Sequence, residues 1–238
     1  MSAELLKLRY LPLPRWTAAL LAAVVVVVGT VLAVVEPSEP DKYLTIPDTT
    51  LGLITALAAI VFGVWSATLE FSAGTLQRTL IAEPARGRVL LSKLALVVAV
   101  TAVGGLLVAA ATGGVTHLAA NHAGVSLDSG ELAARLFGEV PQWISGAIVG
   151  FGFGLLARSL GGGIALALVF VLAFDGMVSF IPGVADYTYG QLSQDFSNGI
   201  TGHGEVQNDF AVAAAGVLAW CALIVVPGWL RFLRGDLK

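Results

Sequence analysis

The chain has 238 residues, of which 57% are hydrophobic and only 12% are charged. Soluble domains carry roughly 25% charged residues, so this composition excludes an ordinary soluble protein. The net charge is -3 and the 13 Lys and Arg residues are scattered, which excludes a nucleic-acid-binding surface. No polar stretch is long enough to build a second core, and we therefore expect a single membrane domain, residues 1–238.

Six apolar stretches are long enough to cross a bilayer. A transmembrane helix needs about 20 mostly apolar residues, because lipid offers no hydrogen-bond partner to an unpaired backbone group. We therefore expect an all-α, polytopic fold with six transmembrane helices. They cover residues 16–35, 51–69, 89–112, 140–156, 163–181 and 210–230. The fourth stretch is the shortest and begins near Pro141.

The first stretch follows Lys7, Arg9 and Arg15, as the apolar core of a signal peptide follows its basic start. It is longer than the 7 to 15 residues typical of a removable signal, and its exit at residues 34–37 lacks a small-x-small cleavage pattern. We interpret it as a retained helix. Residues 3–10 before it predict a short interfacial helix, with a frayed terminus as the alternative.

Positive charges set the orientation of membrane helices, because loops rich in Lys and Arg stay in the cytoplasm. With both termini in the cytoplasm, every Lys and Arg except Lys42 and Arg135 falls on the cytoplasmic side. The opposite orientation reverses this ratio. The sequence therefore predicts both termini inside, in a multi-pass protein of the cell (inner or plasma) membrane.

The loop from Glu70 to Lys93, on the predicted cytoplasmic side, is longer than a simple turn. Residues 75–81 can form two short turns of amphipathic helix, which Pro84 ends. Such a helix can lie against lipid or fit a groove in a partner protein. The alternative is a solvated basic loop that serves topology alone.

This loop, together with the overall plan, resembles the permease subunits of type 2 ATP-binding-cassette (ABC) exporters. The resemblance implies a coupling helix after the second span, a permease dimer (homo- or heterodimer), and docking on cytosolic ABC ATPase subunits. It also implies export of an amphipathic or hydrophobic compound such as an antibiotic, peptide, drug or lipid. The coupling-loop residues would be Glu70, Gly74, Thr75, Leu76, Arg78, Pro84, Arg86 and Arg88.

No phosphate-binding G-x-x-x-x-G-K-[ST] motif occurs in the sequence, so we expect ATP and Mg²⁺ to bind a separate ATPase subunit and this chain to have no enzymatic activity. No cofactor or metal is expected, because His117, His122 and His203 fall in predicted loops. Two alternatives stay open: an ion-coupled secondary transporter or channel, and a membrane scaffold that transports nothing.

Two features within the spans are candidates for function. Gly146, Gly150 and Gly154 share one helix face, where small residues let two helices approach closely, within one chain or between two chains. We favour packing within the chain. Asp175 is an acidic residue within an apolar span, where it either lines a substrate path or bonds to a neighbouring helix.

Residues 182–208 form a long connection between the fifth and sixth spans. The family resemblance suggests short helices there that re-enter the outer leaflet. The many glycines weaken this match, and the alternative is an ordinary flexible loop.

Overall fold

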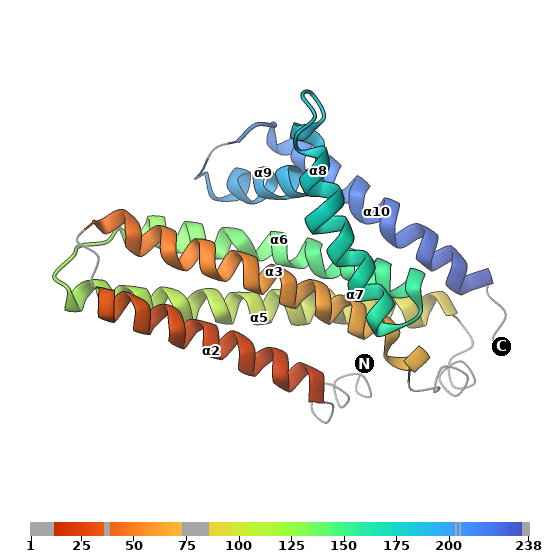
Figure 1. Ribbon diagram of the computed structural model, residues 1–238, viewed down its shortest axis with the longest axis horizontal. Coiled ribbons are helices and arrows are strands. Elements are labelled where there is room, and N and C mark those ends of the chain that lie inside the picture. Colours follow the sequence, from red (N-terminus) through yellow and green to blue (C-terminus); the bar gives the residue numbers. More distant parts are fainter. Residues whose placement is uncertain (1–11, 36–38, 73–85, 203, 205, 235–238) are drawn as a thin grey trace.

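The computed structural model describes residues 12–35, 39–72, 86–202, 204 and 206–234, and these residues are arranged in helices and short connections (Figure 1). The long helices are α2 (Pro12–Val35), α3 (Pro40–Ser72), α5 (Arg86–His122), α6 (Ser129–Ala157) and α10 (Phe210–Arg234). The fifth span consists of α7 (Leu160–Leu168), the π-helix η1 (Val169–Asp175) and α8 (Gly176–Val178). A 3₁₀ turn, η2 (Ala185–Tyr187), and the helix α9 (Tyr189–Thr201) follow it.

Six helices in the described part are long and apolar enough to cross a membrane, which confirms the all-α prediction for a multi-pass membrane protein. Two of them begin 11 residues earlier than expected, whereas the other four begin within about four residues of the predicted start. The second was predicted from residue 51 but α3 begins at Pro40, and the fourth was predicted from residue 140 but α6 begins at Ser129. Both added stretches are polar, which an apolar-run criterion cannot detect. His117 and His122 also lie in a helix, the end of α5, and not in a loop.

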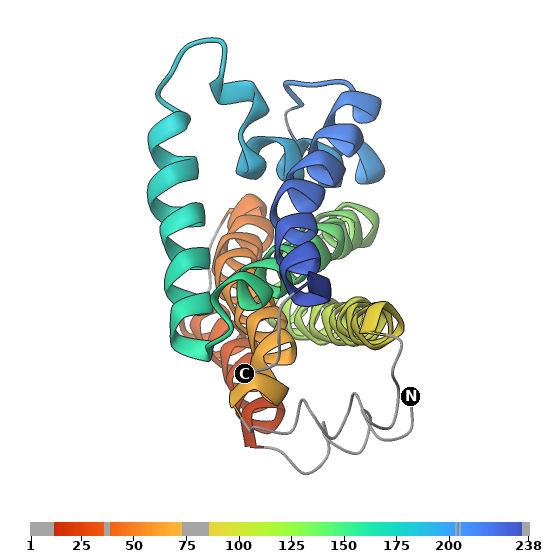
Figure 2. The same cartoon turned by 90° about the vertical axis from the view of Figure 1, so that its right-hand side faces the viewer.

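Four helices run side by side, and two others cross them. In two perpendicular views α2, α3, α5 and α6 lie alongside one another, whereas α7 and α10 are steeply inclined to them (Figures 1 and 2). Helix α6 is central, because it contacts α3, α5, α7, α9 and α10. The start of α2 and the end of α10 lie at the same end of the molecule (Figure 1). Which side of the membrane this end faces remains a prediction from the charges.

The glycine face of α6 packs on α3 of the same chain. A Cβ on Gly150 would collide with the carbonyl oxygen of Ile60, and a Cβ on Gly154 would lie 2.8 Å from the carbonyl oxygen of Val64. Gly63 of α3 faces α6 as closely, because a Cβ there would collide with the carbonyl oxygen of Ala147. The two backbones therefore touch, which gives the extensive van der Waals contact that holds helices together in lipid.

The fifth span packs against α3 and α6 only at its beginning. Gly163 lies against Val64 and Gly154, but the buried side chains end soon afterwards, and none occurs in η1. Its apolar side chains are exposed, as expected for a surface that faces lipid; they include Leu166, Val169, Leu172 and Met177. Phe170 turns inward, and its ring lies 5.5 Å from those of Phe153 and Trp220.

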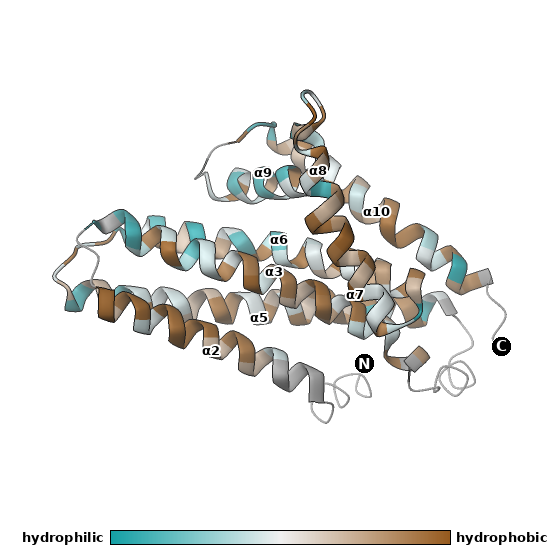
Figure 3. Ribbon diagram, in the orientation of Figure 1, coloured by the Kyte–Doolittle hydropathy of each residue, from teal (hydrophilic) through white to brown (hydrophobic). Residues whose placement is uncertain are grey.

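Hydrophilic residues gather at one end of the molecule, over the first turns of α3 and α6 and along α9, while α2, α5 and α7 are mostly hydrophobic (Figure 3). This polar end lies opposite the end that holds the start of α2 and the end of α10. Residues 3–10 and 73–85, the sites of the predicted interfacial and coupling helices, lie outside the described residues.

Candidate functional site

A polar cavity of about 370 Å³ opens between α3, α6 and α9. Its lining contains two carboxylic acids, one arginine and several amide side chains, in a protein with few charges overall. The lining residues are Asp48, Arg135, Gly138, Glu139, Gln191, Gln194, Asn198, Thr201, Gly204 and Gln207.

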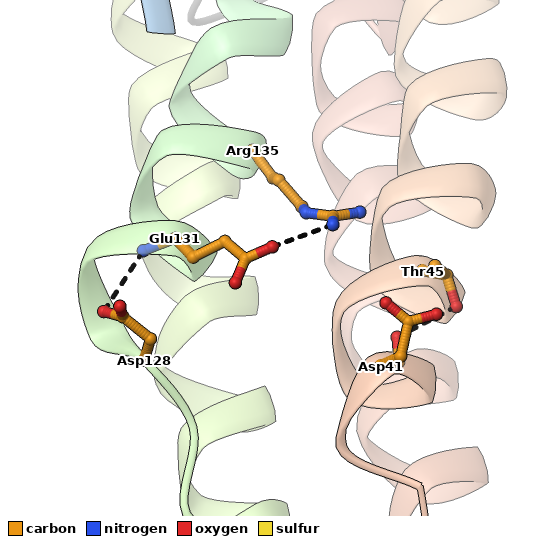
Figure 4. A network of polar contacts seen from close by, with 5 residues as sticks. All are labelled: Asp41, Thr45, Asp128, Glu131 and Arg135. Atoms are coloured by element: carbon orange, nitrogen blue, oxygen red, sulfur yellow. Dashed lines mark hydrogen bonds and ion pairs between the residues drawn. The ribbon is translucent and has the colours of Figure 1, made fainter. Parts of the chain in front are cut away.

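The wall from α6 begins at a capped helix start. Asp128 is the N-cap, and its carboxylate accepts a hydrogen bond of 2.7 Å from the backbone N–H of Gly130. One turn later, Glu131 and Arg135 form an ion pair of 2.8 Å. Figure 4 shows the guanidinium group of Arg135 extending from α6 into the space beside α3. The next turn of α6 adds Glu139 to the cavity.

The wall from α3 carries Asp48, one turn before Gly52. The carboxylate of Glu139 lies against this turn, because a Cβ on Gly52 would be 3.4 Å from its Oε2 atom. Arg135 attracts Asp48, whereas Asp48 and Glu139 repel each other. One oxygen of Asp48, Oδ1, has no hydrogen-bond partner within the described part of the protein.

The third wall is a polar stripe on α9. Gln191, Gln194, Asn198 and Thr201 recur every three or four residues, so they share one face of the helix, and all four line the cavity. Another face is buried, with Tyr189, Leu192 and Ser193 against the rest of the protein. The segment between the fifth and sixth spans is therefore ordered in its helical part and not a flexible loop.

A buried carboxylate in the middle of α9 fixes this helix to the connection that precedes α10. Asp195 has no exposed surface, and its oxygens accept hydrogen bonds from the backbone N–H groups of Gln207 (3.2 Å) and Asn208 (3.0 Å). The side chains of Gln191 and Asn208 donate two more, each of 2.8 Å. Full pairing of this kind is what makes a buried charge tolerable.

The first half of α9 is held by three further hydrogen bonds. Tyr189 and Ser145 of α6 share a hydrogen bond of 2.8 Å, and Ser145 shares another of 3.1 Å with Ser193. Burial raises the pKa of Tyr189, so its hydroxyl stays protonated at physiological pH. Asp175, at the end of η1, accepts a hydrogen bond of 3.0 Å from the backbone N–H of Gly190.

The predicted candidate residues therefore lie in three places. Asp175 contacts the first turn of α9 and does not line the polar cavity. Gly146, Gly150 and Gly154 lie in the interface with α3. Arg88 is exposed in the first turns of α5, Glu70 and Arg86 lie in described helices, and Gly74, Thr75, Leu76, Arg78 and Pro84 lie outside the described residues.

Sequence reasoning missed Asp48, Glu139 and the polar stripe of α9. Part of the signal was present, because Arg135 and Glu139 are four residues apart and the residues of the α9 stripe recur every three or four positions. Asp48, in contrast, is a single acidic residue before an apolar run. Arg135 was counted only as a loop charge.

Chemically, the cavity can bind cations and hydrogen-bond donors through its carboxyl groups, and it offers amide groups to polar ligands. No group of three His, Cys, Asp or Glu residues suited to a metal ion occurs among the described residues. No protein-family model matches the chain, and neither the curated proteins nor the solved structures contain a match to it.

Proposed function

We propose that this protein is the transmembrane permease subunit of an ATP-driven ABC exporter. The observation that carries the proposal is the polar cavity among helices that span the membrane. Ionisable side chains that face a cavity in a membrane protein mark substrate or ion paths, and Asp48, Arg135 and Glu139 line one cavity at the polar end of α3 and α6. A scaffold that transports nothing would have no use for such a cavity.

The polar cavity suits one part of an amphipathic substrate. Arg135 is already paired with Glu131, so Asp48 and Glu139 exceed the available positive charge. We propose that the cavity receives the polar, preferably cationic, group of the exported compound. Its apolar part would remain among the apolar helices or in lipid.

The energy source is proposed to be a separate subunit. The sequence has no P-loop, and its resemblance to ABC exporter permeases centres on the loop between α3 and α5. Two ATPase subunits would dock there, and two permease chains would form the complete transporter in the cell membrane.

The carboxyl groups of the cavity favour one other candidate function, an ion-coupled transporter. Asp48 and Glu139 are close enough to interact, and paired acids along a path are typical of proton- or sodium-coupled transport. In this case no ATPase partner is needed.

One experiment separates the two functions. The protein is extracted from its native membranes in mild detergent, and its partners are identified by mass spectrometry. The proposal predicts a co-purifying ABC ATPase and transport in proteoliposomes that requires ATP. A purified chain that drives transport from an ion gradient, with no ATPase present, would contradict it.

A further inference from the structure

Two arginines lie side by side where the end of α6 meets the end of α10, opposite the polar end of the molecule (Figure 1). Arg158 is the C-cap residue of α6, and Arg231 lies in the last turn of α10. The guanidinium group of Arg158 donates a hydrogen bond of 3.0 Å to the carbonyl oxygen of Arg231. In return, Arg231 donates one of 2.7 Å to the carbonyl oxygen of Leu156. These reciprocal bonds hold the two side chains together.

The arginine pair, Arg158 and Arg231, is accessible at the surface. Arg231 is exposed and Arg158 is partly exposed. The ring of Phe71 lies 5.9 Å from the guanidinium carbon of Arg158 and supports it from one side. A guanidinium group has five N–H donors, and the two carbonyl bonds use one on each arginine. The Nε atom of Arg158 is enclosed, so the donors that a ligand can reach are those of the terminal nitrogens.

The positive charge of this pair is not balanced as it is elsewhere in the protein. Lys42 and Arg135, towards the polar end, form ion pairs of 3.3 Å and 2.8 Å with Glu39 and Glu131. Among the described residues, no carboxylate pairs with either member of the arginine pair, and both bond to backbone carbonyl groups instead. Two neighbouring guanidinium groups of this kind suit a phosphate group, whose oxygens match their planar fork.

An apolar surface continues from the arginine pair along α10. Leu223, Val226 and Leu230 are exposed, and their spacing of three and four residues places them on one face of the helix. Trp229 is partly exposed next to Arg231, as is typical of an aromatic side chain at the level of the lipid head groups. A phosphate held by the arginines would therefore lie beside a surface that suits acyl chains.

We propose that the arginine pair binds the phosphate group of an anionic phospholipid whose acyl chains lie along the exposed face of α10. Basic sites between membrane helices, at the level of the head groups, recognise such lipids. The proposal is independent of the transport function.

Other occupants fit less well. Free phosphate would match the arginines but would gain nothing from the apolar face of α10. A zwitterionic phospholipid carries its own cation, which offsets the charge of its phosphate group.

The test measures the unfolding temperature of the purified full-length chain in a neutral detergent while a ligand is added. Dioleoylphosphatidylglycerol supplies an anionic phosphate with acyl chains, dioleoylphosphatidylcholine supplies the same chains with a neutral head group, and inorganic phosphate supplies the anion alone. Phosphatidylglycerol is expected to raise the unfolding temperature to saturation, because a ligand of the folded state stabilises it. The other two ligands are expected to bind at least about tenfold more weakly.

Arg158→Lys and Arg231→Lys test the geometry of the site, because they keep the net charge but lose the planar fork. Each is expected to weaken phosphatidylglycerol binding about tenfold or more. Arg158→Gly removes the side chain at a left-handed position (φ 55°), which glycine adopts without strain, and is expected to weaken binding at least as much. Each shift is measured from the ligand-free variant, so lost stability does not imitate lost binding.

The matched control is Arg88→Gln, because Arg88 is also exposed and lies in the first turns of α5, near the same end of the molecule. A diffuse basic surface loses about fivefold in affinity for each charge removed, wherever the charge lies, and does not distinguish Lys from Arg. The arginine pair predicts the reverse, with a smaller loss in Arg88→Gln than in either Lys variant.

Three results would overturn the proposal. Phosphatidylcholine could act at the same concentrations as phosphatidylglycerol, which would mean that the acyl chains alone bind. Inorganic phosphate could do so, which would make this a site for the free anion. The Lys variants could bind phosphatidylglycerol as the wild type does, which would leave only a diffuse attraction.

Discussion

Helices α3 and α6 meet in two different ways along their length. In one half, from Gly146 to Gly154, glycines bring the two backbones into contact. In the other half, Asp48 on α3 and Arg135 and Glu139 on α6 border a cavity of about 370 Å³. Small residues close the pair at one end, and long charged side chains with α9 keep it open at the other.

The comparison teaches that the open half depends on the closed half. Two helices that touch through their backbones have a fixed separation, because packed interfaces transmit strain and do not deform gradually. The positions of the charged residues a few turns away are thereby fixed as well. Changes in the closed half should affect folding, and changes in the open half should affect binding and transport.

The largest effect is expected in the closed half. Gly150→Leu places a side chain against the carbonyl oxygen of Ile60, so the two helices must separate. We expect a loss of about 3 kcal/mol or more of stability and little folded protein in detergent. Thermal unfolding and the monodisperse yield measure this.

The control for this substitution is Gly161→Leu, because a Cβ at Gly161 meets nothing within 4 Å. It should leave the yield close to that of the wild type. Normal folding and transport by Gly150→Leu would contradict the difference drawn between the two halves, because the closed half would then not be a packed contact.

The next effect concerns the α9 wall. Asp195→Ala removes a buried carboxylate that accepts four hydrogen bonds from Gln191, Gln207 and Asn208. We expect a loss of about 2–4 kcal/mol, measured as a lower unfolding temperature. Asp209→Ala, at an exposed position, is the matched control. Equal unfolding temperatures for the two variants would show that this network does not hold α9.

In the open half we expect changes of activity with little change of stability. Glu139→Gln and Asp48→Asn each keep the shape of the side chain but remove a carboxylate from the cavity. Loss of one charge-assisted hydrogen bond, worth about 1.5–3 kcal/mol, should weaken substrate binding roughly tenfold to a hundredfold. Transport at equal expression measures this. Activity that stays at the wild-type level in both variants would remove the cavity from the substrate path.

The smallest effect is expected at Asp175. Its carboxylate accepts a hydrogen bond from the backbone N–H of Gly190, and the amide oxygen of an Asn side chain can accept the same bond. Asp175→Asn should therefore transport at more than half of the wild-type rate. A loss of transport as large as that of Glu139→Gln would place Asp175 on the path as well.

The sequence predicted six apolar helices because the length and polarity of a span are set by the bilayer. It could not predict the polar beginnings of α3 and α6, because helices outside the hydrocarbon need no apolar run. Asp128 as an N-cap and the ion-pair spacing of Glu131 and Arg135 were the available signals. The cavity escaped prediction because α9 lies far along the chain from Asp48 and Glu139, and only tertiary packing brings the three segments together.

The most direct test of the central claim measures access to the polar cavity in membrane vesicles. Cys221 is the only cysteine and is buried, so Cys221→Ala gives a background for Gln194→Cys, an exposed position on the cavity wall. Ser193→Cys, which is buried on the opposite face of α9, is the control. The label is a membrane-impermeant maleimide, supplied on the side opposite the ATP.

We predict that the cysteine at position 194 reacts, that the one at position 193 does not, and that ATP with Mg²⁺ changes the rate at position 194 in vesicles that retain the partner ATPase. A rate that ignores ATP but follows an ion gradient would contradict the ATP-driven permease. No reaction at position 194 from either side of the membrane would contradict the cavity itself.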